Sequence, residues 1–193
     1  MMNSMRKNKK MSFQDYLNEI QKCIDNKCYI ASLTLALMIP DICGKALYPN
    51  ENNSSRYKKW YSIYVGSFLY YKNVNIDDSD KTSWVSADVA YSLRCHMLHE
   101  ALPNVSKREI KQEENKIDKI HINFSDSAVF FISSTTSSTF GKTVRTMDIS
   151  AQSLSDLLLR SGKAFYTDNK NEIDKNYTTI IDGFGNKYLQ TEE

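Results

Sequence analysis

The chain has 193 residues, of which 41% are hydrophobic and 25% charged, so it can bury a core and has the composition of a globular domain. A formal net charge of +2 is too small to indicate nucleic-acid binding by itself, and six glycines and three prolines disfavour a turn-rich all-β fold. The four cysteines form no CxxC pair, which favours free thiols in a reducing compartment, and we expect a cytoplasmic protein.

The first helix is predicted to follow a basic, flexible segment of residues 1–11. No apolar stretch follows that segment, which argues against a secretory signal. Ser12 with Asp15 three residues later is typical of a helix start, and apolar residues then recur at helical spacing as far as Ile24.

Residues 28–47 are apolar almost all round, which predicts a central helix buried on several sides. Pro40 lies inside this segment, so we expect either a kink near Met38 or a new helix beginning at Pro40. The longest apolar run, residues 30–39, is about half the length needed to span a bilayer, and no membrane association is expected.

Two further helices are predicted before Pro103. Residues 56–71 carry aromatic side chains on one face, and core packing explains this stripe better than a base-stacking surface does; its members are Tyr57, Trp60, Tyr61, Tyr64 and Phe68. Residues 82–101 form the next helix, with an apolar stripe at Trp84, Ala87, Tyr91 and Leu98. Arg94 occupies the missing place in that stripe, so it must face a carboxylate or line a cleft.

The C-terminal half is predicted to hold a small β element. Residues 104–119 are charged, as in a surface helix or linker, and a hairpin through 125–127 would join strands at 120–124 and 128–132. We interpret residues 133–139, SSTTSST, as a flexible loop. A third strand at 142–149, a helix at 151–168 and a small hairpin through Asp182-Gly183 would follow. The expected organisation is therefore a helical bundle over 12–102, and a β element with a C-terminal helix packed on the bundle over 103–193.

Residues 91–100, YSLRCHMLHE, concentrate the residues that carry chemistry. Cys95 or His96 could share a helical face with His99, but a zinc site needs three or four ligands, and no second cluster has ligand spacing. We therefore expect no metal and no cofactor. The remaining candidates are a catalytic pair, Arg94 and His99, and a purely structural role for the same residues.

Arg94 and His99 form the pattern R-x4-H near the end of a predicted helix in an all-α context, and here the sequence resembles the HEPN superfamily. The phrase YSLRCHMLHEAL, with DICGKAL and RYKKWY before it, also resembles small bacterial HEPN-like proteins. The resemblance covers residues 12–102. It implies a mainly α, HEPN-like helical bundle, to which this chain adds a small β-hairpin or sheet in its C-terminal half.

The resemblance also implies a function. HEPN ribonucleases cleave RNA without a metal, in stress or phage defence, and usually act as homodimers in which two motifs meet. By that resemblance Arg94 grips and stabilises the phosphate, and His99 transfers the proton of the attacking ribose hydroxyl. His96, Cys95, Glu100 and Asp41 would support the pair. The resemblance also allows for an antitoxin or another regulatory partner.

A non-catalytic binding or interaction module remains the alternative. Cys95 stands where active family members often have a polar residue, and on an ideal helix Arg94 and His99 lie roughly 140° apart. Arg94 could instead pair with Asp41 or Asp88, while His99 caps the helix end. A fixed Arg94–Asp41 pair would favour the module, whereas an open cleft presenting both Arg94 and His99 would favour the nuclease.

Overall fold

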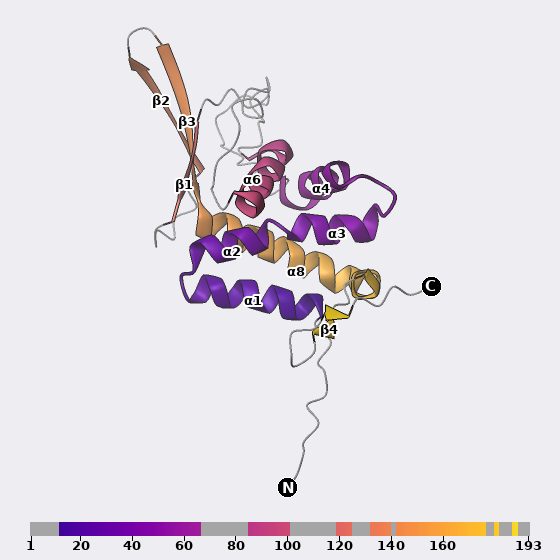
Figure 1. Ribbon diagram of the computed structural model, residues 1–193. Helices are drawn as coiled ribbons and strands as arrows, with labels where there is room; N and C mark the ends of the chain where they lie inside the picture. Colours follow the sequence, from indigo (N-terminus) through magenta and orange to yellow (C-terminus); the bar gives the residue numbers. More distant parts are fainter. Residues whose placement is uncertain are drawn as a thin grey trace.

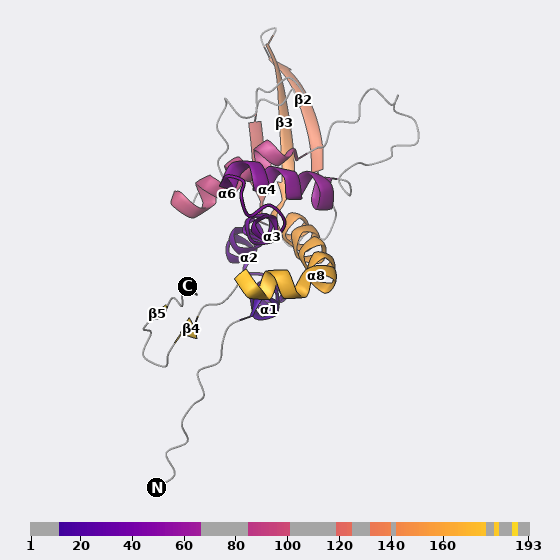
Figure 2. The ribbon, with the colours of Figure 1, turned by 90° about the vertical axis from the view of Figure 1, so that its right-hand side faces the viewer.

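The protein is mainly helical with a small sheet, as the sequence predicted (Figure 1). The computed structural model describes residues 12–66, 85–100, 119–124, 132–139, 142–176, 180–181 and 187–188. The helical body has α4 (Asn53–Tyr61) and α6 (Ala87–His99) on one side, α2 (Tyr29–Ala36) and α3 (Ile39–Leu47) in the middle and α1 (Phe13–Asp25) on the other side. Helix α8 (Ala151–Asn176) runs beside them (Figures 1 and 2).

Helix α1 (Phe13–Asp25) begins where the sequence predicted. The Ser12 hydroxyl accepts a hydrogen bond from the Asp15 backbone N–H at 3.2 Å, and the Asp15 carboxylate accepts one from the Ser12 N–H at 3.0 Å. This reciprocal capping satisfies two N–H groups that the first helical turn leaves unpaired. The buried face of α1 then packs against α2 and α8; it consists of Phe13, Tyr16, Leu17 and Ile20.

The apolar segment 28–47 forms two helices, α2 (Tyr29–Ala36) and α3 (Ile39–Leu47), separated by a turn at residues 37–38. Pro40 lies in the first turn of α3, where its missing N–H is not needed, so the prediction of a new helix near Pro40 is confirmed. By length and composition, Tyr29–Leu47 would be able to cross a membrane. Half of this apolar stretch is buried within the protein, however, and a core helix of a globular protein can have the same length and composition.

Helix α4 (Asn53–Tyr61) continues into a π-helix at Ser62–Gly66. Tyr57, Trp60 and Tyr61 of α4 are fully buried and Tyr64 packs against the core, which confirms the predicted core packing for these members of the aromatic stripe; Phe68 lies outside the described residues. The ring of Trp60 meets that of Phe165 edge to face, with centroids 5.6 Å apart. These aromatic contacts join α4 to α8.

Helix α8 (Ala151–Asn176) packs against α1, α2 and α3 and supplies a large part of the core. It extends past residue 168, where the sequence placed its end, and Asn169 interrupts it with non-helical backbone angles. The side-chain amide of Asn169 donates to the Phe165 carbonyl at 3.0 Å, so a polar side chain takes over part of the backbone pairing at the kink.

The sheet corrects one prediction. Its order is β1-β3-β2, with β1 (Lys119–Asn123) parallel to β3 (Lys142–Ser150) and β2 (Ile132–Thr139) antiparallel to β3. Residues 133–139 are therefore a strand and not a flexible loop, because they pair with β3 along their whole length and threonine suits a pleated strand. The β2–β3 ribbon extends away from the helices in both views (Figures 1 and 2).

A short hairpin lies near the C-terminal end, where β4 (Ile180–Ile181) pairs antiparallel with β5 (Lys187–Tyr188). Several predictions lie outside the described residues. These are the segments 1–11, 67–84, 104–118 and 125–131, Pro103, and the turn at Asp182-Gly183.

Candidate functional site

Helix α6 (Ala87–His99) carries the candidate residues. It begins at Ser86, whose hydroxyl accepts a hydrogen bond from the Val89 N–H at 3.2 Å. Val89, Leu93 and Met97 follow one another at intervals of four residues and are almost completely buried. Their row fixes α6 against the core of the protein and determines which side chains lie at its border.

The apolar stripe predicted for this helix is not its buried face. Leu98 is 37% exposed, and Ala87 and Tyr91 are only partly buried. The physical reason is that two neighbouring rows of α6 are apolar, and the row of Val89, Leu93 and Met97 takes the core position. Arg94 therefore lies at the border of the core and not within it, which makes its charge less costly to accommodate.

Arg94 pairs with Asp41 of α3. The guanidinium Nη2 lies 2.5 Å from Asp41 Oδ2, and the two side chains are 19% and 12% exposed. Of the two carboxylates that the sequence offered as partners, Asp88 is instead paired with Lys58 at 2.5 Å. The Arg94–Asp41 contact joins α6 to α3 through two largely buried opposite charges.

This pair is close but incompletely hydrogen-bonded. Both Asp41 carboxylate oxygens and Arg94 Nε are buried, and within the described part of the chain none of them has a well-aligned hydrogen-bond partner. Arg94 Nη1 lies 3.9 Å from Cys95 Sγ, which is a weak acceptor. The two charges still form an ion pair at this distance, because Coulomb attraction depends little on the bond angle.

The charges around Arg94 change its proton affinity. Burial alone would lower the pKa of the guanidinium, but Asp41 and Cys95 beside it raise that pKa above its ordinary value. Burial raises the pKa of Tyr57 and of Tyr91, and Asp41 contributes to both. Arg94 therefore stays charged, and both tyrosines keep their protons at neutral pH.

The histidines of the motif do not join Arg94. His96 Nδ1 lies 3.2 Å from Glu100 Oε2, four residues later on the same helix, although this nitrogen lacks a well-aligned hydrogen bond. His99 is the last residue of α6 and is exposed. Glu100, expected to support the catalytic pair, contacts His96 instead.

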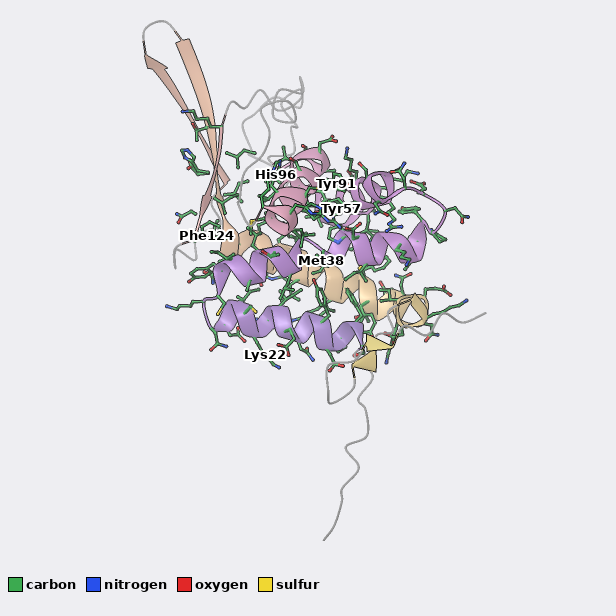
Figure 3. All side chains as sticks on the ribbon, in the orientation of Figure 1. Lys22, Met38, Tyr57, Tyr91, His96 and Phe124 are labelled. Atoms are coloured by element: carbon green, nitrogen blue, oxygen red, sulfur yellow. The ribbon has the colours of Figure 1, made fainter. Side chains whose placement is uncertain are left out.

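Two side chains of α4 that the sequence did not assign to this site, Tyr57 and Lys58, contact α6. The Tyr57 hydroxyl of α4 donates to the Ala90 carbonyl at 3.4 Å, and the rings of Tyr57 and Tyr91 meet edge to face at 5.2 Å. Lys58 pairs with Asp88, and its ammonium lies 5.5 Å from the centre of the Tyr91 ring. Figure 3 labels Tyr57 and Tyr91, where α4 and α6 meet, and His96 on α6. The buried aromatic stripe was the signal that could have placed Tyr57 here.

Among the described residues, no group of three or more His, Cys, Asp or Glu side chains could hold a metal ion. His121, the third histidine of the chain, lies on β1 with its Nδ1 3.3 Å from Asp148 Oδ1. The four cysteines are free thiols. The chemistry available at α6 is therefore that of an arginine–carboxylate pair, two imidazoles and a thiol.

Comparison with known proteins gives no match: no family model, no curated protein and no solved structure matches this chain.

Proposed function

We propose that this chain is a non-catalytic, HEPN-like interaction module that presents the C-terminal half of α6 to a protein partner. The observation that carries the proposal is the Arg94–Asp41 pair. The HEPN-like part rests on the helical body and on R-x4-H at the end of α6, where Arg94 and His99 fall.

The pair opposes a phosphate-binding role for Arg94. A phosphate would have to compete with a carboxylate that already lies 2.5 Å from the guanidinium. If the phosphate displaced Asp41, it would leave that carboxylate buried without its counter-charge, which is strongly unfavourable. Lys58 of α4, which contacts α6, is likewise matched by Asp88. Among the described residues, the two cations paired at α6, Arg94 and Lys58, are therefore both compensated by carboxylates, whereas nucleic-acid affinity depends on uncompensated cations.

The exposed end of α6 has the mixed chemistry of a protein interface. Leu98 is 37% exposed, and His99 and Glu100 beside it are exposed as well. An apolar centre with a polar rim is how such interfaces are built. A second copy of the chain is the partner that we propose first, since two-fold dimers are the commonest oligomers and use the same patch on both subunits.

Light scattering at micromolar concentration tests this proposal. We expect the wild type to be a dimer and Leu98→Glu to weaken association about tenfold or more, because the charge would lie in the contact. Ile30→Glu is the matched control, since Ile30 on α2 is 60% exposed and lies outside the proposed interface. A monomeric wild type, or equal weakening by both variants, would argue against α6 as the interface.

Metal-independent cleavage of RNA is the second candidate, and one observation favours it. Arg94 and His99 lie on the same helix, His99 is exposed, and the Arg94 side chain keeps 19% of its surface accessible. A dimer about α6 would allow Arg94 of one subunit to face His99 of the other. In that case Arg94→Ala and His99→Ala would each abolish cleavage, whereas His96→Ala would have a milder effect.

A further inference from the structure

The corner between α1 and α2 has a defined hydrogen-bonding pattern. The Cys28 N–H donates to the Cys23 carbonyl at 2.8 Å, and the Lys27 N–H donates to the Ile24 carbonyl at 3.0 Å. Lys27 has a φ of 59°, in the left-handed region. These three features define a Schellman motif at the end of α1.

This motif brings the two cysteines together. In a Schellman motif the residue in the position of Cys28 characteristically contacts the side chain of the residue in the position of Cys23. With the 2.8 Å hydrogen bond, standard backbone bond lengths and the bent Cα–C=O geometry place the two Cα atoms at most about 6.7 Å apart. Disulfides span Cα separations of roughly 4.4–6.8 Å, so the backbone is already within bridging range.

The two thiols differ in accessibility. Cys28 is exposed and Cys23 is partly buried, whereas Cys43 is fully buried in the core. Burial and the neighbouring Cys28 raise the pKa of the Cys23 thiol, which is a second sign that the two side chains are close. The exposed Cys28 is therefore the thiol that reacts first with an external reagent, and Cys23 is the thiol that reacts second.

We propose that Cys23 and Cys28 form a redox-active pair that closes to an intrachain disulfide when the reduced chain meets a low-molecular-weight disulfide. The Cys28 thiolate attacks one sulfur of that disulfide, forms a mixed disulfide and releases one thiol. The Cys23 thiolate then attacks the Cys28 sulfur and releases the second thiol. The two cysteines lose two electrons and two protons, and the small disulfide is reduced to two thiols.

The bridge would join the last turn of α1 to the residue that precedes α2 (Tyr29–Ala36). The Cys28 thiol, which now lies 3.7 Å from the Asn26 carbonyl oxygen, would have to turn toward Cys23, while the Schellman hydrogen bonds keep the backbone spacing. This site is separate in sequence from α6 and does not depend on the function proposed for that helix.

Incubation of the full-length reduced protein with oxidised glutathione tests the proposal. After an acid quench, intact mass should show a species lighter by two hydrogen atoms that takes up two fewer alkyl groups under denaturing conditions. Peptide mapping should link Cys23 to Cys28. Cys23→Ser should stop at the mixed glutathione disulfide on Cys28, and Cys95→Ser, the matched control, should close like the wild type.

Three results would overturn the proposal that Cys23 and Cys28 form a redox-active pair. The wild type could accumulate the glutathione adduct on Cys28 without closing, the new disulfide could join two chains, or it could form equally in Cys28→Ser. Each is read from the wild-type or variant mass, so none depends on a change in folding.

Discussion

Breaking the Arg94–Asp41 pair from either side should destabilise the protein more than breaking an exposed pair does. Its side chains are 19% and 12% exposed, which places the pair between exposed ion pairs, at about 0–1 kcal/mol, and fully buried ones, where removal of one partner costs about 3–5 kcal/mol. We therefore expect Asp41→Ala and Arg94→Ala each to lower the free energy of unfolding by about 2–3 kcal/mol. For a chain of this size that corresponds to a fall in Tm of roughly 4–12 °C.

A double-mutant cycle separates the pair from the packing of each side chain. Urea unfolding of the wild type, both single variants and the double variant should give a coupling energy of about 1.5–3 kcal/mol. The control cycle uses Lys58 and Asp88, which are equally close at 2.5 Å but 36% and 33% exposed, and should give less than about 1 kcal/mol. Equal couplings in the two cycles would refute the idea that Arg94 and Asp41 form a fixed, partly desolvated pair.

Three further outcomes are expected. Gly44→Ala should destabilise the protein by about 1–3 kcal/mol in thermal melts, because its Cβ would lie 2.7 Å from the Arg56 carbonyl oxygen. Gly66→Ala should not, because among the described residues its Cβ would meet only the Tyr61 carbonyl oxygen, at 3.7 Å. Burial and Asp174 raise the pKa of Tyr166 to about 12, so the folded state keeps a proton that the unfolded chain releases near pH 10. Stability should therefore fall between about pH 10 and 12, and less steeply in Tyr166→Phe. Elemental analysis of protein purified without chelator should find well below one zinc per chain.

Helix boundaries were predictable where the signal was local. Ser12 and Asp15 cap their own helix, and Pro40 predicts either a kink or the start of a helix, so both boundaries could be recognised from neighbouring residues. The strand at 132–139 could not be predicted from neighbouring residues, because this hydroxyl-rich segment becomes a strand only through pairing with residues 142–149. The kink at Asn169 depends likewise on a side chain that bonds back to Phe165.

The contacts in the candidate site likewise depend on tertiary packing that neighbouring residues do not reveal. The sequence identified Arg94 as a charge that needs a partner and offered Asp41 or Asp88. Only the packing of α6 against α4 determines that Asp88 pairs with Lys58 and that Asp41 pairs with Arg94. The error about the buried face of α6 has a similar origin. Two adjacent rows of that helix are apolar, and the neighbouring helices decide which of them is buried.

Cleavage of single-stranded RNA in the presence of EDTA tests most directly whether α6 is an interaction surface or a catalytic one. The wild type, His99→Ala and His96→Ala are compared at equal concentration after the same purification. We predict that the wild type cuts no faster than His99→Ala, because Arg94 is held by Asp41 and His99 stands apart from it on the helix. Cleavage by the wild type that falls about 10²–10⁴-fold in His99→Ala, with His96→Ala little changed, would contradict this account and identify a metal-independent ribonuclease.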